Sequence, residues 1–304
     1  MAPTRPGEPA VSVVIPAYNQ DRFLGTAIRS VLEQTLPPDE VIVVDDGSTD
    51  GTGDVLAAFG DSVVVVGQVN SGVSAARNAG VARASGSLIA FLDADDVWVP
   101  AKLERQVDRF RRDPDLGLVH TGVQHIDEGG AVTGANVDGL DGWVSREMLL
   151  LRRPVVLEAG STAVVPRRVF EALGGFDTRL STAADWDLSY RISRRHRVGF
   201  VPDVLVSYRY HGENMHSNVD SLRHDMLLAF EKAFSEDPEV DRATRRRAYA
   251  RLHLILSGSY AHVPNWPSAI RHGALAVALV PSQLSYMVRT RSRRRSQTLL
   301  GGGA

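Results

Sequence analysis

Short apolar runs alternate with segments of helical periodicity along the first 115 residues of the chain. The runs are rich in β-branched residues, which is typical of buried strands, and the segments between them repeat apolar residues every three or four positions. Strands that read as continuous apolar runs need cover on both faces, so the pattern predicts an α/β fold with a mostly parallel sheet flanked by helices. The expected strands are residues 11–15, 41–44, 63–66 and 87–92, and the expected helices are 23–32, 54–59, 74–84 and 102–111.

The pattern becomes mixed beyond residue 115. A Gly-rich stretch at 129–142 is too long for a tight turn and predicts a mobile or substrate-facing loop. From residue 221 the spacing predicts helices up to 288 with a break at 264–267, followed by a basic and then Gly-rich tail that we expect to be disordered. The remaining expected elements are strands at 116–120, 162–165 and 204–210 and a helix at 187–195. The predicted domains are 10–215, a helical extension at 216–290 and a tail at 291–304.

Polar clusters follow three of the expected strands, at residues 16–19, 45–50 and 93–96. Ligands in parallel sheets bind beyond the carboxyl ends of the strands, where these clusters fall. In the last cluster a buried run ends in Asp93, Asp95 and Asp96, whose like charges repel unless a cation offsets them. The interpretation is a divalent metal that holds a diphosphate; the alternative is a loop before a helix that starts near Pro100.

Composition narrows the choice of function. The 304 residues carry a net charge of −2, which gives no reason to expect nucleic acid as a partner. The chain has no cysteine, so a disulfide framework and a thiolate metal site are both excluded. The N-terminus is Pro-rich and polar and has no apolar signal segment, and the longest late apolar stretch, residues 274–280, is too short to span a bilayer. The absence of cysteine fits a cytoplasmic location, which is therefore expected.

Four motifs follow one another along the chain: VVIPAYN at 13–19, VVDDGSTD at 43–50, NAG at 78–80 and DADD at 93–96. In this order they resemble glycosyltransferase family 2 over about residues 10–215. The resemblance implies the GT-A fold and an inverting enzyme of the hexosyltransferase type. Such an enzyme moves a sugar from a nucleoside diphosphate sugar, here expected to be a UDP-sugar, to the hydroxyl of a carbohydrate, lipid-linked or small-molecule acceptor.

The resemblance also assigns a nucleotide-sugar site. One of Asp45 and Asp46 contacts the uracil imide, and we favour Asp46; the competing interpretation is a turn-forming Asx motif. Tyr18 lies near the base in this assignment, although a half-buried packing role competes, and Arg77 lies near the base or diphosphate, with a surface ion pair as the alternative. The full expected set is Pro16, Tyr18, Asp45, Asp46, Arg77 and Asp93.

The implied cofactor is Mg²⁺ or Mn²⁺. Asp95 is the expected metal ligand, with Asp93 near the ribose and the metal. His211 follows the last expected strand of the domain and is the candidate imidazole ligand, with His216 in reserve. An ordinary histidine in a surface loop is the competing interpretation.

Inversion needs a base that removes the proton from the acceptor hydroxyl. The family places this base in an Asp that usually follows Glu and precedes Trp. Here Asp185 occupies the position, Ala184 replaces the usual acidic neighbour, and Asp187 is a weaker candidate. The competing structural interpretation makes Asp185 a helix N-cap.

Other interpretations remain open for the function and for the C-terminal region. Because Ala184 departs from the family pattern, a non-catalytic nucleotide-sugar-binding module is the second hypothesis for function. The C-terminal helices offer a surface for a homo-oligomer or a lid, and the basic stretch 289–295 offers one for peripheral contact with an anionic membrane. A dehydrogenase is disfavoured, because no G-x-G-x-x-G follows the first strand.

Overall fold

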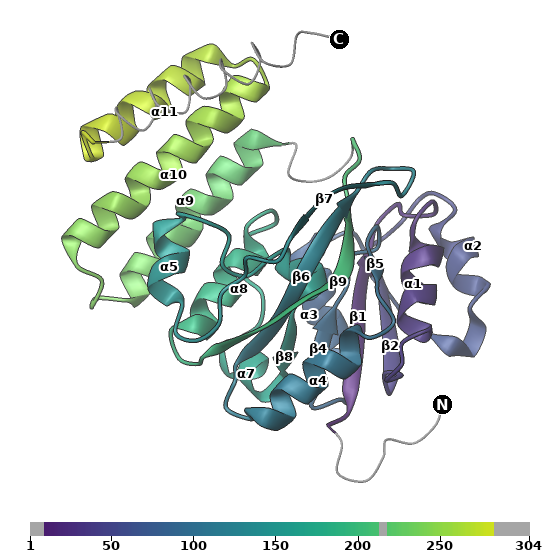
Figure 1. Cartoon of the computed structure of the whole chain (residues 1–304). Coiled ribbons are helices and arrows are strands. Elements are labelled where there is room, and N and C mark those ends of the chain that lie inside the picture. Colours follow the sequence, from purple (N-terminus) through teal and green to yellow (C-terminus); the bar gives the residue numbers. More distant parts are fainter. Residues whose placement is uncertain (1–8, 213–217, 283–304) are drawn as a thin grey trace, which may run out of the picture. The chain divides into compact units, whose positions relative to one another are not determined.

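A computed structural model describes residues 9–212 and 218–282 (Figure 1). The chain divides into two compact units. One contains the chain up to Met148 together with Arg153–Asp225, and we call it the catalytic unit. The other contains Leu149–Arg152 and the chain from Met226 on. The predicted domain boundaries at 215 and 290 stay predictions.

The catalytic unit is built on one nine-stranded sheet in the order β3-β2-β1-β4-β8-β6-β9-β5, with β7 paired to β6. The strands β3, β2, β1 and β4 are parallel, as their apolar runs predict. Beyond β4 the pairing becomes mixed, because β8 and β5 run antiparallel to their neighbours while β6 and β9 are parallel. The strands are β1 (Val11–Ala17), β2 (Glu40–Asp45), β3 (Val64–Gly67), β4 (Leu88–Phe91), β5 (Val97–Trp98), β6 (Leu118–Ile126), β7 (Val132–Asn136), β8 (Val164–Pro166) and β9 (Val198–Arg209).

Helices cover both faces of the parallel part of the sheet. Alternate residues of a strand point to opposite faces, so Val13 and Ile15 of β1 join the core under α1 and α4. Val14 points to the other face, where Gly80 of α3 packs so closely that an added Cβ would lie 2.4 Å from Val14 Cγ1. The helices of this unit are α1 (Leu24–Leu32), α2 (Thr52–Ala57), the 3₁₀ turn η1 (Gly60–Ser62), α3 (Val73–Arg83), α4 (Lys102–Arg112), α6 (Ala159–Thr162), α7 (Arg167–Ala172) and α8 (Ala184–Ser193). Helix α5 (Ser145–Leu150) begins in this unit, and its last two residues belong to the other.

The second half of the catalytic unit departs from the sequence prediction in three places. The stretch predicted as a loop at 129–142 contains β7, which pairs with β6. Residues 159–162 form the short helix α6 before strand β8 begins at Val164. The helix predicted at 187–195 begins at Ala184 with Ala183 as its N-cap, so Asp185 lies in the first helical turn and is not the cap.

The second unit consists mainly of helices, as the sequence predicts. The break near Pro264 is confirmed, and a second break separates α9 from α10, where the Asp241 side chain caps α10 by accepting a hydrogen bond from the Thr244 backbone N–H. Within the described residues no helix is long and apolar enough to cross a membrane. The helices are α9 (Val219–Glu236), which begins in the catalytic unit, α10 (Arg242–His262) and α11 (Trp266–Leu279).

Candidate active site

The loops that follow β1 and β2 are joined by hydrogen bonds. Asn19 adopts a left-handed backbone conformation (φ 53°), and its Oδ1 accepts from the backbone N–H of Thr49 at 2.8 Å. The backbone N–H of Asn19 in turn donates to Ser48 Oγ. Next to this junction Tyr18 is 47% exposed, which leaves its ring free to stack on a ligand, whereas Pro16 is buried within β1 and contributes to the position of the loop.

Asp45 and Asp46 differ sharply in their surroundings. Asp46 is buried, and its carboxylate accepts from Gln68 Nε2 and from the backbone N–H groups of Ser71 and Gly72, at 2.6 to 2.8 Å. Three of its four lone-pair sites are therefore used to hold the loop after β3. Asp45 is partly exposed and accepts one hydrogen bond, from the backbone N–H of Ser48. The geometry therefore favours Asp45 as the acceptor for a base N–H, whereas the sequence analysis favours Asp46 for that contact.

Arg77 links the helix α3 to the aspartate cluster after β4. Its side chain is nearly fully buried and Nη2 donates to Asp93 Oδ1 at 2.5 Å. Burial acts to lower the pKa of Arg77. The negative charges of Asp93 and Asp185 outweigh burial, so that the pKa of Arg77 is raised above its ordinary value. The Nε of Arg77 is buried and has no hydrogen-bond partner within the part of the chain that the structure describes.

Gly160 of α6 packs against the ion pair of Arg77 and Asp93. A Cβ at Gly160 would lie 2.5 Å from Asp93 Oδ2 and 2.7 Å from Arg77 Nη2, so only glycine allows the helix to approach so closely. The next residue, Ser161, donates through Oγ to Asp96 and accepts from the backbone N–H of Asp93. No motif in the sequence pointed to Gly160 or Ser161.

Asp95 and Asp96 have different roles in the cluster. Asp96 is fully buried and accepts from Ser161 and from the backbone N–H of Arg209, so it holds the β9 end against the cluster. Burial, and then the charges of Asp95 and Asp93, raise the pKa of Asp96 well above its ordinary value. Asp95 Oδ2 lies 2.8 Å from His211 Nε2. Burial and the charge of Asp93 raise the pKa of Asp95 as well. His216 lies outside the described residues.

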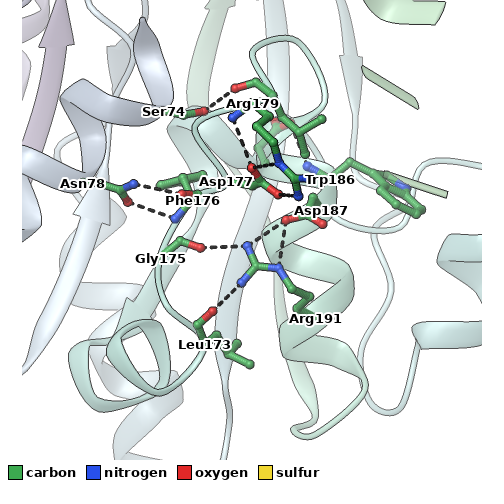
Figure 2. Close-up of polar contacts among 12 residues, drawn as sticks. Ser74, Asn78, Leu173, Gly175, Phe176, Asp177, Arg179, Trp186, Asp187 and Arg191 are labelled. Atoms are coloured by element: carbon green, nitrogen blue, oxygen red, sulfur yellow. Dashed lines mark hydrogen bonds and ion pairs between the residues drawn. The ribbon is translucent and has the colours of Figure 1, made fainter. Parts of the chain in front are cut away.

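The two acidic side chains at the start of α8 are also distinct. Asp187 is buried in an ion pair with Arg191 at 2.7 Å, and Arg191 also donates to the backbone oxygens of Leu173 and Gly175 (Figure 2). Asp185 is partly exposed, and its carboxylate accepts from the backbone N–H of Trp186. Asp187 is therefore committed to structure, while Asp185 remains accessible.

The loop before α8 is fixed by polar side chains from two other elements. Asn78 of α3 exchanges two hydrogen bonds with the backbone of Phe176, as Figure 2 shows. Asp225 of α9 is buried and accepts from the backbone N–H groups of Ser181 and Ala183. Asp225 lies outside the region of the motifs, and nothing in its sequence neighbourhood indicated a role near the site.

The sequence model of Glycosyl transferase family 2 matches residues 12–174, which is more than half of the chain. The chain belongs to glycosyltransferase family 2. It is 34% identical over 226 residues to an uncharacterized glycosyltransferase of Nostoc sp., a match that covers 69% of this chain and 68% of that protein. An uncharacterized glycosyltransferase of Rickettsia felis is 31% identical over 209 residues, and there the match covers 67% of this chain but only 35% of the relative.

Solved structures of glycosyltransferases share the fold, and the protein is thus a GT-A type glycosyltransferase. Staphylococcus aureus TarS, in complex with UDP-GlcNAc, superposes with a TM-score of 0.66 at 17% identity, covering 90% of this chain and 82% of that one. The mannosyltransferase PcManGT of Pyrobaculum calidifontis, in complex with GDP-Man and Mn²⁺, gives 0.60 at 23% identity, covering 96% and 82%.

Proposed function

We propose that this glycosyltransferase moves a sugar from a nucleoside diphosphate sugar, with UDP as the preferred carrier, to an acceptor hydroxyl with inversion at the anomeric carbon. Family membership and the strand-end position of the candidate residues support the donor class. The UDP-GlcNAc complex of TarS supports the choice of a UDP-sugar.

Asp185 is the proposed base, and the observation that carries this assignment is its contrast with Asp187. Both lie in the first turn of α8, but Asp187 is held by Arg191, while Asp185 is partly exposed and acts electrostatically on Arg77. As the acceptor oxygen attacks the anomeric carbon, Asp185 takes the hydroxyl proton. The bond from that carbon to the phosphate oxygen breaks, and its electron pair leaves with the nucleoside diphosphate.

Asp93, Asp95 and His211 are the proposed protein ligands for a divalent cation, Mg²⁺ or Mn²⁺. The raised pKa of Asp95, caused by burial and by Asp93, marks a place where a cation would offset negative charge. Within the described residues no three acidic or histidine side chains gather closely enough to hold a metal by themselves. The phosphates of the donor would therefore have to complete the coordination of the metal, as they commonly do for Mg²⁺. A bound metal would neutralise the charge that develops on the departing diphosphate.

Asp45 and Tyr18 are the proposed contacts for the nucleotide base. Asp45 keeps acceptor capacity for a base N–H, and the exposed ring of Tyr18 lies on the adjacent loop. Asp46 supports this site indirectly, since it fixes the loop at 68–72. Arg77 is the proposed source of positive charge near the diphosphate, because its guanidinium is paired with Asp93 of the aspartate cluster.

Substitution of the base tests the mechanism. We expect Asp185→Asn to lower kcat by about 10² to 10⁴, the range for loss of a general base, and to leave the affinity for UDP unchanged by calorimetry. Asp203→Asn is the matched control, because Asp203 is a partly exposed aspartate of β9 whose partner is the exposed Arg105. Unchanged turnover in Asp185→Asn would contradict the assignment. Binding of UDP without transfer to any acceptor by the unmodified protein would favour the binding-module hypothesis.

A further inference from the structure

Charge is distributed very unevenly along this chain. Residues 242–304 contain eleven of the 34 basic side chains, all of them arginine, and none of the 36 acidic ones. With histidine neutral, this stretch carries a formal charge of +11, so the preceding 241 residues carry −13. The net charge of −2 therefore conceals a strongly basic C-terminal fifth, and such an asymmetry indicates an anionic partner.

The described part of this basic stretch is an antiparallel hairpin of α10 and α11 (Figure 1). Three pairs fix its register: Arg246 donates to the carbonyl of Leu279, His253 meets His272 at 3.0 Å, and Ser257 donates to the carbonyl of Ala269. The inner face of α11 is made of small residues and one histidine, which lets the two helices approach closely. These residues are Ala269, His272, Gly273 and Ala276.

The outer face of α11 is apolar although it is exposed. Trp266 is 53% exposed, Ile270 70% and Leu275 38%. Trp266, Ile270 and Ala274 follow one another at intervals of four, so they form a single row along the helix. Arg271 is the one charged residue of α11, and it lies on the exposed side. We call the exposed residues 266, 267, 270, 271, 274, 275 and 278 the outer face.

We propose that the outer face of α11 docks on an anionic lipid bilayer. A helix that lies in a membrane interface combines an apolar face carrying Trp or Leu with basic residues, and this hairpin has both. A second copy docked face to face would set Arg271 and the basic stretch around it against their own equivalents, and residues 283–304 of the same chain carry five arginines and no acidic residue, so charge disfavours both as occupants. A bilayer with acidic headgroups offers an apolar interior for Trp266 and Ile270 and negative charge for the arginines.

Vesicle co-sedimentation of the full chain tests the proposal without any enzymatic readout, so its outcome is independent of the proposed reaction. We expect binding to vesicles of phosphatidylcholine and phosphatidylglycerol in a three-to-one ratio, release by added salt, and no binding to phosphatidylcholine alone. Ile270→Glu should reduce the bound fraction at least about tenfold, because it places a charge in the apolar row. Replacing the five arginines between 289 and 295 with glutamine should also abolish binding, at about fivefold per arginine.

Val132→Glu is the matched control, because Val132 of β7 is 61% exposed and lies in the other unit. This variant should bind the mixed vesicles as the unmodified chain does. Equal binding by Ile270→Glu would overturn the proposal, as would binding to both vesicle types alike. If the chain binds neither vesicle and forms a dimer that Ile270→Glu dissociates, the outer face is a homodimer surface and the proposal is wrong.

Discussion

On the proposed donor side of the catalytic unit, loops that follow neighbouring parallel strands are hydrogen-bonded to one another, as Asn19 is to Thr49 and Asp46 is to Gly72. We call the second half of this unit, which carries the proposed base Asp185, the acceptor side; its longer connections are held by buried side chains. Arg191 holds residues 173 and 175, and His120 holds residues 140 and 157. The donor-side contacts join loops that follow adjacent strands, whereas loss of an acceptor-side side chain leaves buried polar groups without their partner.

The largest effect is therefore expected from the Asp187–Arg191 pair. Asp187→Asn leaves a buried guanidinium without its carboxylate, which should lower the free energy of unfolding by about 3 to 5 kcal/mol. Urea denaturation measures this change. The matched control is Asp185→Asn in the same helical turn, which should shift stability by less than about 0.5 kcal/mol because Asp185 is partly exposed. Equal losses in the two variants would refute the division of roles between these aspartates.

His120 should make the free energy of unfolding depend on pH in the acid range. The ring is fully buried between the carbonyl of Leu140, which accepts from Nε2–H, and the N–H of Leu157, which donates to Nδ1. The bond from Leu157 requires an unprotonated Nδ1 and therefore a neutral imidazole, whereas Nε2–H can donate to Leu140 in either state. Burial lowers the pKa of His120 from 6.5 to about 4. Between these two values the unfolded chain binds a proton that the folded chain does not. The free energy of unfolding should then decrease by up to about 3 kcal/mol as the pH falls from 6.5 to 4.

Stability measured across that pH range, for the unmodified protein and for His120→Gln, separates this contribution from the others. The variant should start less stable near neutral pH and should lack the part of the acid loss that comes from residue 120. An NMR titration of the His120 ring gives a direct control. Protonation near pH 6.5 in the folded protein would contradict the neutral tether.

The contrast between the donor side and the acceptor side also explains which features could be predicted from the sequence. The donor-side strands and their polar clusters follow from local pattern, because each strand is short, apolar and followed at once by its functional loop. The acceptor-side contacts join residues far apart in the chain: Ser181 to Asp225, His120 to Leu157, and Ser161 to Asp96. No periodicity encodes such pairs. Strand β7 was missed for a related reason, since its residues are mostly exposed and lack the apolar signature of a buried strand.

The smallest expected effects on stability distinguish two neighbouring aspartates of the donor side, Asp45 and Asp46. Asp46→Asn turns one acceptor oxygen into a donor facing N–H groups, which should cost about 2 kcal/mol of stability. Asp45→Asn keeps an acceptor for the backbone N–H of Ser48 and should leave stability unchanged, while it weakens UDP binding about tenfold through loss of a charged acceptor. Thermal denaturation and calorimetric titration of both variants distinguish the two roles. If UDP affinity drops only in Asp46→Asn at equal stability, the buried aspartate is the base contact after all, and the loop after β3 must rearrange when the nucleotide binds.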